Sequence, residues 1–83
     1  MKQQLSTATQ LGQVLLSARR AAGLSQSDLA ARLAVSQSRI SHMELNPGTI
    51  SAGQLLALVS VLGLELVVQD RGAADAAAPA VEW

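Results

Sequence analysis

Residues 26–45 read QSDLAARLAVSQSRISHMEL and carry the strongest structural signal in the chain. It predicts two short helices that begin near Ser25 and Ser36 and are joined by a tight turn at Ala34-Val35. Apolar residues recur at helical spacing and form one inward stripe, made by Leu29, Ala30, Leu33, Val35, Ile40 and Met43. The other positions of the second helix are polar, which leaves that face free to enter the major groove of double-stranded DNA.

Helices are also predicted on both sides of this stretch. The first begins at about Thr9 and ends at Gly23. Either Thr7 or Thr9 is expected to cap its start. The last runs from about Ser51 to Leu62, opens with the capping-box pattern Ser-x-x-Gln and ends at a glycine. The sequence Asn46-Pro47-Gly48 breaks the helix before it. The expected fold is mainly α, a bundle of four to five helices.

The hydrophobic period changes after the last predicted helix. Residues 64–69, LELVVQ, alternate and are rich in branched side chains, which is typical of a β-strand. No other segment has a strand pattern, so we expect this one to pair with its copy in a second subunit. The dimer residues would be Leu64, Leu66, Val67 and Val68. The alternative is that the segment extends the preceding helix or stays irregular.

Length and composition restrict the class of protein. Eighty-three residues accommodate one domain, expected at 9–70, with flexible ends at 1–8 and 71–83. The chain has no Cys and one His, so neither a disulfide nor a metal site can stabilise it, and no cofactor is expected. Subunit association is therefore the expected source of extra stability.

No small-molecule ligand, membrane span or signal peptide is expected, which predicts a cytoplasmic, nucleoid-associated protein. No catalytic constellation is present, so an enzyme is not expected.

The net charge is zero, but the charges are unevenly placed. Residues 1–46 carry five basic and two acidic side chains, whereas residues 47–83 carry one basic and four acidic ones. The basic half contains the polar helix that follows Ser36, as expected for a surface that faces phosphates. The alternative is that this uneven distribution of charges arose by chance. The only aromatic residue is Trp83, so the stacking platforms typical of single-strand binders are missing.

The stretch GLSQSDLAARLAVSQSRISHMEL, residues 23–45, resembles the helix-turn-helix of the XRE (Cro/C1-type) repressor family. The resemblance covers roughly residues 9–62 and implies a lambda-repressor-like bundle. Ala34 stands where the family usually has Gly, and a left-handed Ala costs about 1 kcal/mol. The resemblance implies that Arg19 and Glu44 form a structural salt bridge. It implies DNA contacts by Gln26, Ser36, Gln37, Ser38, Arg39, Ser41, His42, Asn46 and Thr49.

Three further features of the sequence resemble the HipB-like antitoxins of the same family. They are Thr9-Gln10-Leu11, the segment after Gly63 and the terminal Glu82-Trp83. The resemblance implies a homodimer that represses palindromic operators and autoregulates its operon. It also implies a HipA-like serine/threonine kinase as partner, bound through Glu82 and Trp83, unless those residues are an inert end.

Two other functions remain open from the sequence. A stand-alone XRE-type or phage-type repressor would share the DNA-binding residues and have no toxin partner. The second function is that of a protein-interaction module that has lost DNA binding. The docking helix of such a module should expose apolar anchors, whereas the helix that follows Ser36 is polar.

Overall fold

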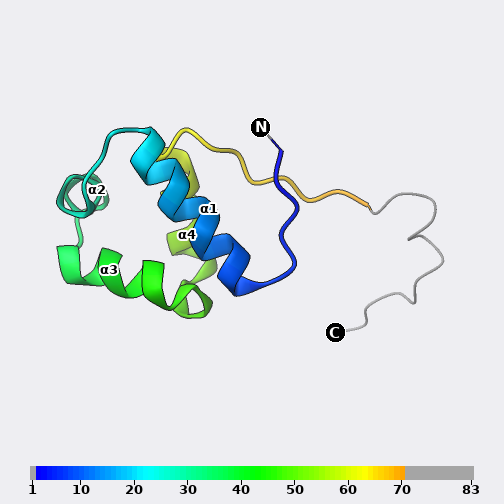
Figure 1. Cartoon of the computed structure of the whole chain (residues 1–83), viewed down its shortest axis with the longest axis horizontal. Helices are drawn as coiled ribbons and strands as arrows, with labels where there is room; N and C mark the ends of the chain where they lie inside the picture. Colours follow the sequence, from blue (N-terminus) through cyan, green and yellow to red (C-terminus); the bar gives the residue numbers. More distant parts are fainter. Residues whose placement is uncertain (1, 71–83) are drawn as a thin grey trace.

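The computed structural model describes residues 2–70, which contain four α-helices and one 3-10 turn (Figure 1). The elements are α1 (Ala8–Ala21), α2 (Gln26–Leu33), α3 (Gln37–Leu45), η1 (Pro47–Thr49) and α4 (Ala52–Val61). The predicted helical bundle is therefore confirmed. Residues 71–83, with the predicted tail and its Glu82 and Trp83, lie outside the described residues.

Each α-helix begins at a hydroxyl side chain that accepts a backbone N–H of the first turn. The caps are Thr7 for α1, Ser25 for α2, Ser36 for α3 and Ser51 for α4. All but Ser36 belong to reciprocal capping boxes. In the box of α2, the Ser25 N–H donates to the Asp28 carboxylate at 2.9 Å. This bond favours the ionised form, and it lowers the pKa of Asp28.

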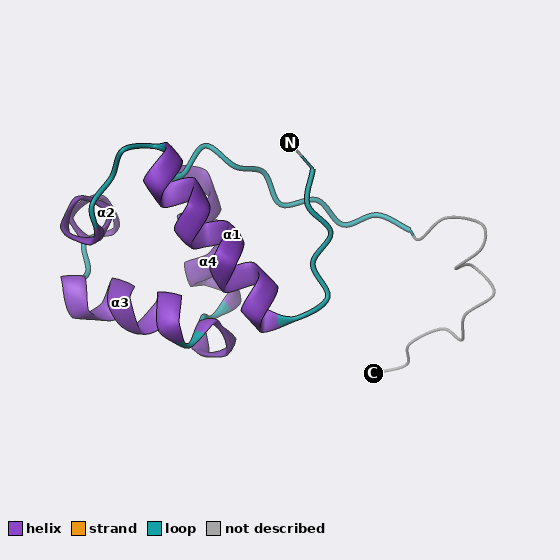
Figure 2. Cartoon of the chain, viewed as in Figure 1, coloured by secondary structure: helices purple, strands orange, loops and turns teal. Residues whose placement is uncertain are grey.

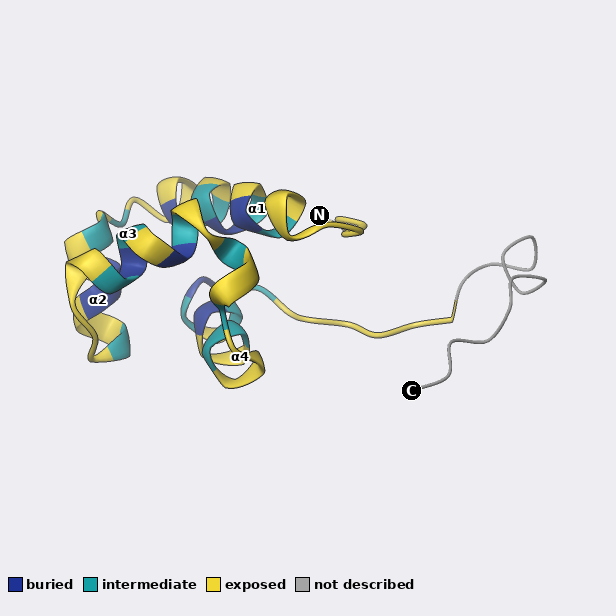
Figure 3. Cartoon of the chain, turned by 90° about the horizontal axis from the view of Figure 1, so that it is seen from below, coloured by how far each residue is buried: buried dark blue, intermediate teal, exposed yellow. Residues whose placement is uncertain are grey.

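The helices bury one apolar cluster between them. Its members are Leu15, Leu29, Ala30, Ile40, Met43, Leu58 and Leu62. Every α-helix contributes to this cluster, with Leu62 capping the end of α4. Figure 3 shows the buried positions on the inner sides of the helices and the exposed ones on the outside. The helices α2 and α3 are too short to persist alone in water, so this shared core is what stabilises them.

A left-handed residue closes the turn between α2 and α3. Ala34 has φ 56° and ψ 41°, and it is the only non-glycine residue with positive φ among residues 2–70. The N–H of Val35 donates to the Ala30 carbonyl at 3.0 Å, which satisfies a free carbonyl at the end of α2. The left-handed conformation expected at Ala34 is thus observed. Val35, predicted as a core contact, is instead 37% exposed because it lies in the turn itself.

A buried ion pair joins α1 to α3. Arg19 is 8% exposed, and its Nε lies 2.6 Å from Oε2 of Glu44. Its Nη1 donates to the Leu24 carbonyl at 2.9 Å, in the connection between α1 and α2. Glu44 Oε1 accepts a second bond from Gln26 Nε2 at 2.9 Å, at the start of α2. This is the pair that the family resemblance implied, and it holds three helices at one point.

The segment after α4 is extended but unpaired in the single chain. Residues 64–70 belong to no helix or strand, and Figure 2 draws them as loop. The predicted strand therefore does not form within residues 2–70, since a strand needs a neighbouring strand for its backbone N–H and C=O groups. Val67 is 65% and Val68 94% exposed. Pairing through Leu64, Leu66, Val67 and Val68 of two subunits stays a prediction.

The close approach of α1 to η1 gives a prediction. A Cβ built on Gly12 would lie 2.8 Å from Cγ of Pro47 and 3.4 Å from the Glu44 carbonyl oxygen. We expect Gly12→Ala to lower the free energy of unfolding by about 1–3 kcal/mol, because the Pro47 ring must move. The control is Gly53→Ala in α4, where no atom lies within 4 Å. It should be neutral or stabilising by up to about 1 kcal/mol. Equal effects in urea unfolding would contradict the close contact.

The ion pair gives a second prediction. Glu44→Ala leaves the Arg19 guanidinium buried without its counter-charge, so we expect a loss of about 3 kcal/mol in the free energy of unfolding. The matched control replaces both partners, Arg19→Met with Glu44→Leu, which removes the charge together with its partner. This double variant should be more stable than the single one in urea unfolding. A double variant less stable than Glu44→Ala would show that the uncompensated charge is not the source of the loss.

Candidate nucleic-acid interface

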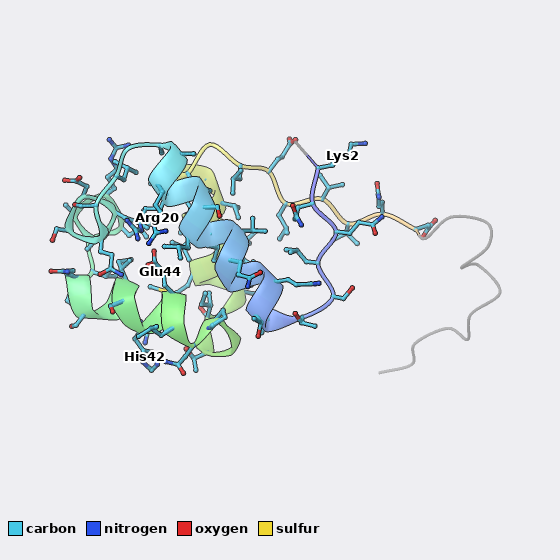
Figure 4. All side chains as sticks on the ribbon, viewed as in Figure 1. Lys2, Arg20, His42 and Glu44 are labelled. Atoms are coloured by element: carbon cyan, nitrogen blue, oxygen red, sulfur yellow. The ribbon has the colours of Figure 1, made fainter. Side chains whose placement is uncertain are left out.

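The outward face of α3 is polar apart from Leu45 and borders a shallow hollow. The hollow is lined by Gln26, Gln37, Ser38, Ser41, His42 and Leu45. At about 100° per residue, the five of these on α3 occupy an arc of about 140° on the helix. Ile40 and Met43 lie on the opposite side and are buried. Figure 4 shows His42 pointing away from the bundle and Glu44 pointing into it. One side of α3 thus anchors the helix and the other faces solvent.

Gln26 links this hollow to the buried ion pair. Its Nε2 donates to Glu44 Oε1, and its Oε1 accepts a long bond of 3.4 Å from Gln37 Nε2. The Ser27 hydroxyl donates to Gln37 Oε1 at 3.3 Å. The amide of Gln37 is therefore held at both ends by α2. The amide nitrogen keeps one further hydrogen to donate, and the oxygen keeps one further lone pair. That donor and acceptor are the pair needed to bind the N7 and N6 of an adenine.

Two further candidates lie at the flank of the hollow. Ser36 is occupied as the cap of α3, where its Oγ accepts the Arg39 N–H at 3.1 Å and lies 3.2 Å from Ser38 Oγ. Arg39 is partly buried, and its position on the helix falls between the polar face and the core side. A guanidinium at such an edge is better placed for a phosphate than for a base edge.

The last two candidates lie beyond the C-terminal end of α3. Asn46 Nδ2 is 3.5 Å from His42 Nδ1, and the Thr49 hydroxyl donates to the Asn46 carbonyl at 2.7 Å. The structure therefore brings five of the nine expected DNA contacts into the hollow, and the other four do not line it. Two residues at the site were missed by sequence reasoning, Ser27 and Leu45. Helical periodicity contains the signal for Leu45, because it lies four residues after Ser41.

Two negative findings apply to residues 2–70. Within them, no group of three or more His, Cys, Asp or Glu side chains is arranged to hold a metal ion. None of the helices in this part of the chain has the length and apolar character needed to cross a membrane.

Comparison with known proteins places the chain in a family. A family model described as helix-turn-helix matches residues 15–69. No curated protein sequence matches the chain. A solved structure described as "HipB-O1-O2 complex" is 28% identical, with a TM-score of 0.75 over 83% of this chain and 100% of that chain.

Two further solved structures are similar to the same extent. One is described as "Structure of HipA-HipB-O2-O3 complex" and the other as "HipB-O4 20mer complex". Each is 28% identical, has a TM-score of 0.75, and covers 83% of this chain and 97% of its own. The residues that match the family model include both α2 and α3. The chain therefore belongs to the XRE-type helix-turn-helix family and has a HipB-like fold.

Proposed function

We propose that this chain is a sequence-specific repressor that binds double-stranded DNA. The observation that carries the proposal is the polar face of α3, which is held from behind by Gln26 and by the Arg19–Glu44 pair. Family membership supports it, and so does the fold shared with the chains of the HipB-O1-O2 and HipB-O4 20mer complexes. The family and the fold also indicate a non-enzymatic regulator.

The contacts divide by chemistry. Gln37 and Ser38 lie in the first turn of α3, the part of a recognition helix that meets base edges. Ser41 and His42 extend the same face by one turn. The remaining expected contacts are assigned to phosphates, which fix the register of the protein on the duplex without reading sequence: Gln26, Ser36, Arg39, Asn46 and Thr49.

The active form in this proposal is a homodimer. The segment 64–68 is extended, apolar and largely exposed in the single chain, and such a segment is a template for pairing. Pairing with its own copy creates a two-fold axis. A two-fold protein presents two α3 helices to two half-sites, which is why a palindromic operator is expected.

We further propose that the protein is a HipB-type antitoxin that autoregulates its operon and binds a HipA-like serine/threonine kinase. Its fold is shared with a chain of the HipA-HipB-O2-O3 complex, which supports this assignment. Glu82 and Trp83 are the residues proposed to contact the kinase, since Trp is a favoured anchor residue at interfaces.

The base-reading role of Gln37 is testable. Gln37→Ala removes the donor and acceptor proposed for adenine, and each lost bidentate contact is worth about 1–3 kcal/mol of discrimination. We expect binding to a duplex selected from a random library to weaken about tenfold or more, and binding to random duplex to change little. The control is Gln13→Ala on the exposed side of α1. Equal losses on both duplexes in an electrophoretic shift assay would instead assign Gln37 to phosphate.

The dimer is testable through Val67. This side chain is 65% exposed in the single chain, so Val67→Asp spares the core but places like charges together at the proposed pairing. Sedimentation velocity should then show monomer or unfolded chain, where the unaltered protein gives a dimer. A matched charge control is Ser17→Asp on α1, which should stay dimeric. A Val67→Asp dimer of unchanged affinity would exclude the pairing.

The kinase assignment is testable by retention from native lysate, read by mass spectrometry. We expect the whole chain to retain a HipA-like kinase, and Trp83→Ala or a chain ending at Pro79 to retain less. Equal retention by all three would keep the antitoxin assignment and remove the role of the last residues. No kinase in any sample would leave a stand-alone repressor of the XRE or phage type.

A further inference from the structure

An exposed leucine interrupts the polar face of α3. Leu45, the last residue of the helix, is 78% exposed. It lines the same hollow as Gln37, Ser41 and His42, and lies one turn beyond Ser41 on the same side of the helix. Every other side chain that lines this hollow ends in an amide, a hydroxyl or an imidazole. Leu45 is therefore a single apolar group within a polar surface.

The surroundings of Leu45 indicate what covers it. A helix that docks on a protein presents several apolar anchors along one face, and α3 presents one. The exposed apolar side chains of segment 64–68 are a separate surface, since Figure 1 shows that segment running away from α3. The major groove of DNA has the complementary character. It displays hydrogen-bond donors and acceptors together with the isolated 5-methyl group of each thymine.

We infer that Leu45 contacts the 5-methyl group of a thymine in the major groove, and so reads a base pair that the polar side chains do not. This inference rests on the proposed DNA-binding function. Leu45 follows Gln37 by eight residues, which is about 12 Å along a helix axis. Base pairs stack at about 3.4 Å. The thymine therefore lies at most about three to four base pairs from the base that Gln37 reads, since a helix inclined to the duplex axis spans fewer base pairs.

The experiment replaces thymine by uracil, which removes the methyl group and keeps the base pair. The probe is a palindromic duplex selected by the unaltered protein from a random library, with uracil placed at one position of both half-sites at a time. Burial of one methyl contributes roughly a fourfold change in affinity, so two half-sites together give about sixteenfold. We expect this loss at one position within that distance of the base that Gln37 reads, and its disappearance in Leu45→Ala. The variant should fold, because Leu45 is exposed and Ala is a strong helix former.

The control is Leu56→Ala on α4, an exposed leucine away from the hollow, which should keep the uracil sensitivity of the unaltered protein. The same loss with uracil in the unaltered protein and in Leu45→Ala would overturn the inference and leave the DNA-binding proposal intact. A Leu45→Ala variant with unchanged DNA affinity but a weaker dimer in sedimentation would also overturn it, by making Leu45 a subunit contact. Failure to select any duplex would overturn both proposals.

Discussion

The contact between Arg19 and Glu44 is the constraint on which the rest of the molecule depends. Removing two charges from water is costly, and the cost is offset only where the geometry is good and the remaining polar groups are bonded. Here the guanidinium meets both carboxylate oxygens and the Leu24 carbonyl, and Glu44 also accepts from Gln26. No buried side-chain polar atom among residues 2–70 lacks a partner. One fully bonded cluster thus fixes α1, α2 and α3 relative to one another.

Helix α3 has to be held firmly against the bundle and also has to keep one face free for DNA. The helix is nine residues long and buries two apolar side chains, Ile40 and Met43. The other face must stay largely polar if it is to meet the hydrogen-bonding groups of base edges. A short helix with so little apolar burial needs another anchor, which the ion pair supplies. The same carboxylate then orients Gln26, and Gln26 bonds to Gln37. The stabilising contact and the reading residue are connected by hydrogen bonds through one side chain.

Much of the fold was predictable because its signals are local. Hydroxyl caps and apolar spacing indicated all four α-helices, and the left-handed Ala34 was expected from the resemblance to a family that usually has Gly at that position. The bonds among Ser27, Gln26 and Gln37 were not predictable, since they depend on how α2 lies against α3. Leu45 was missed because its residue type suggests a core position, whereas its place on the helix faces solvent. The strand predicted after Gly63 depends on a second subunit, so one chain alone cannot form it.

The central claim is that the polar face of α3, positioned by α2, enters the major groove. Nuclear magnetic resonance of the isotope-labelled protein, titrated with the selected duplex, tests it directly. We expect the largest shifts in the side-chain amides of Gln26 and Gln37 and in the backbone amides of Ser38, Ser41 and His42. The Arg19 side chain should keep its signal, since the ion pair persists in the complex. Shifts concentrated on α4 and residues 64–70, with α3 unaffected, would contradict the account.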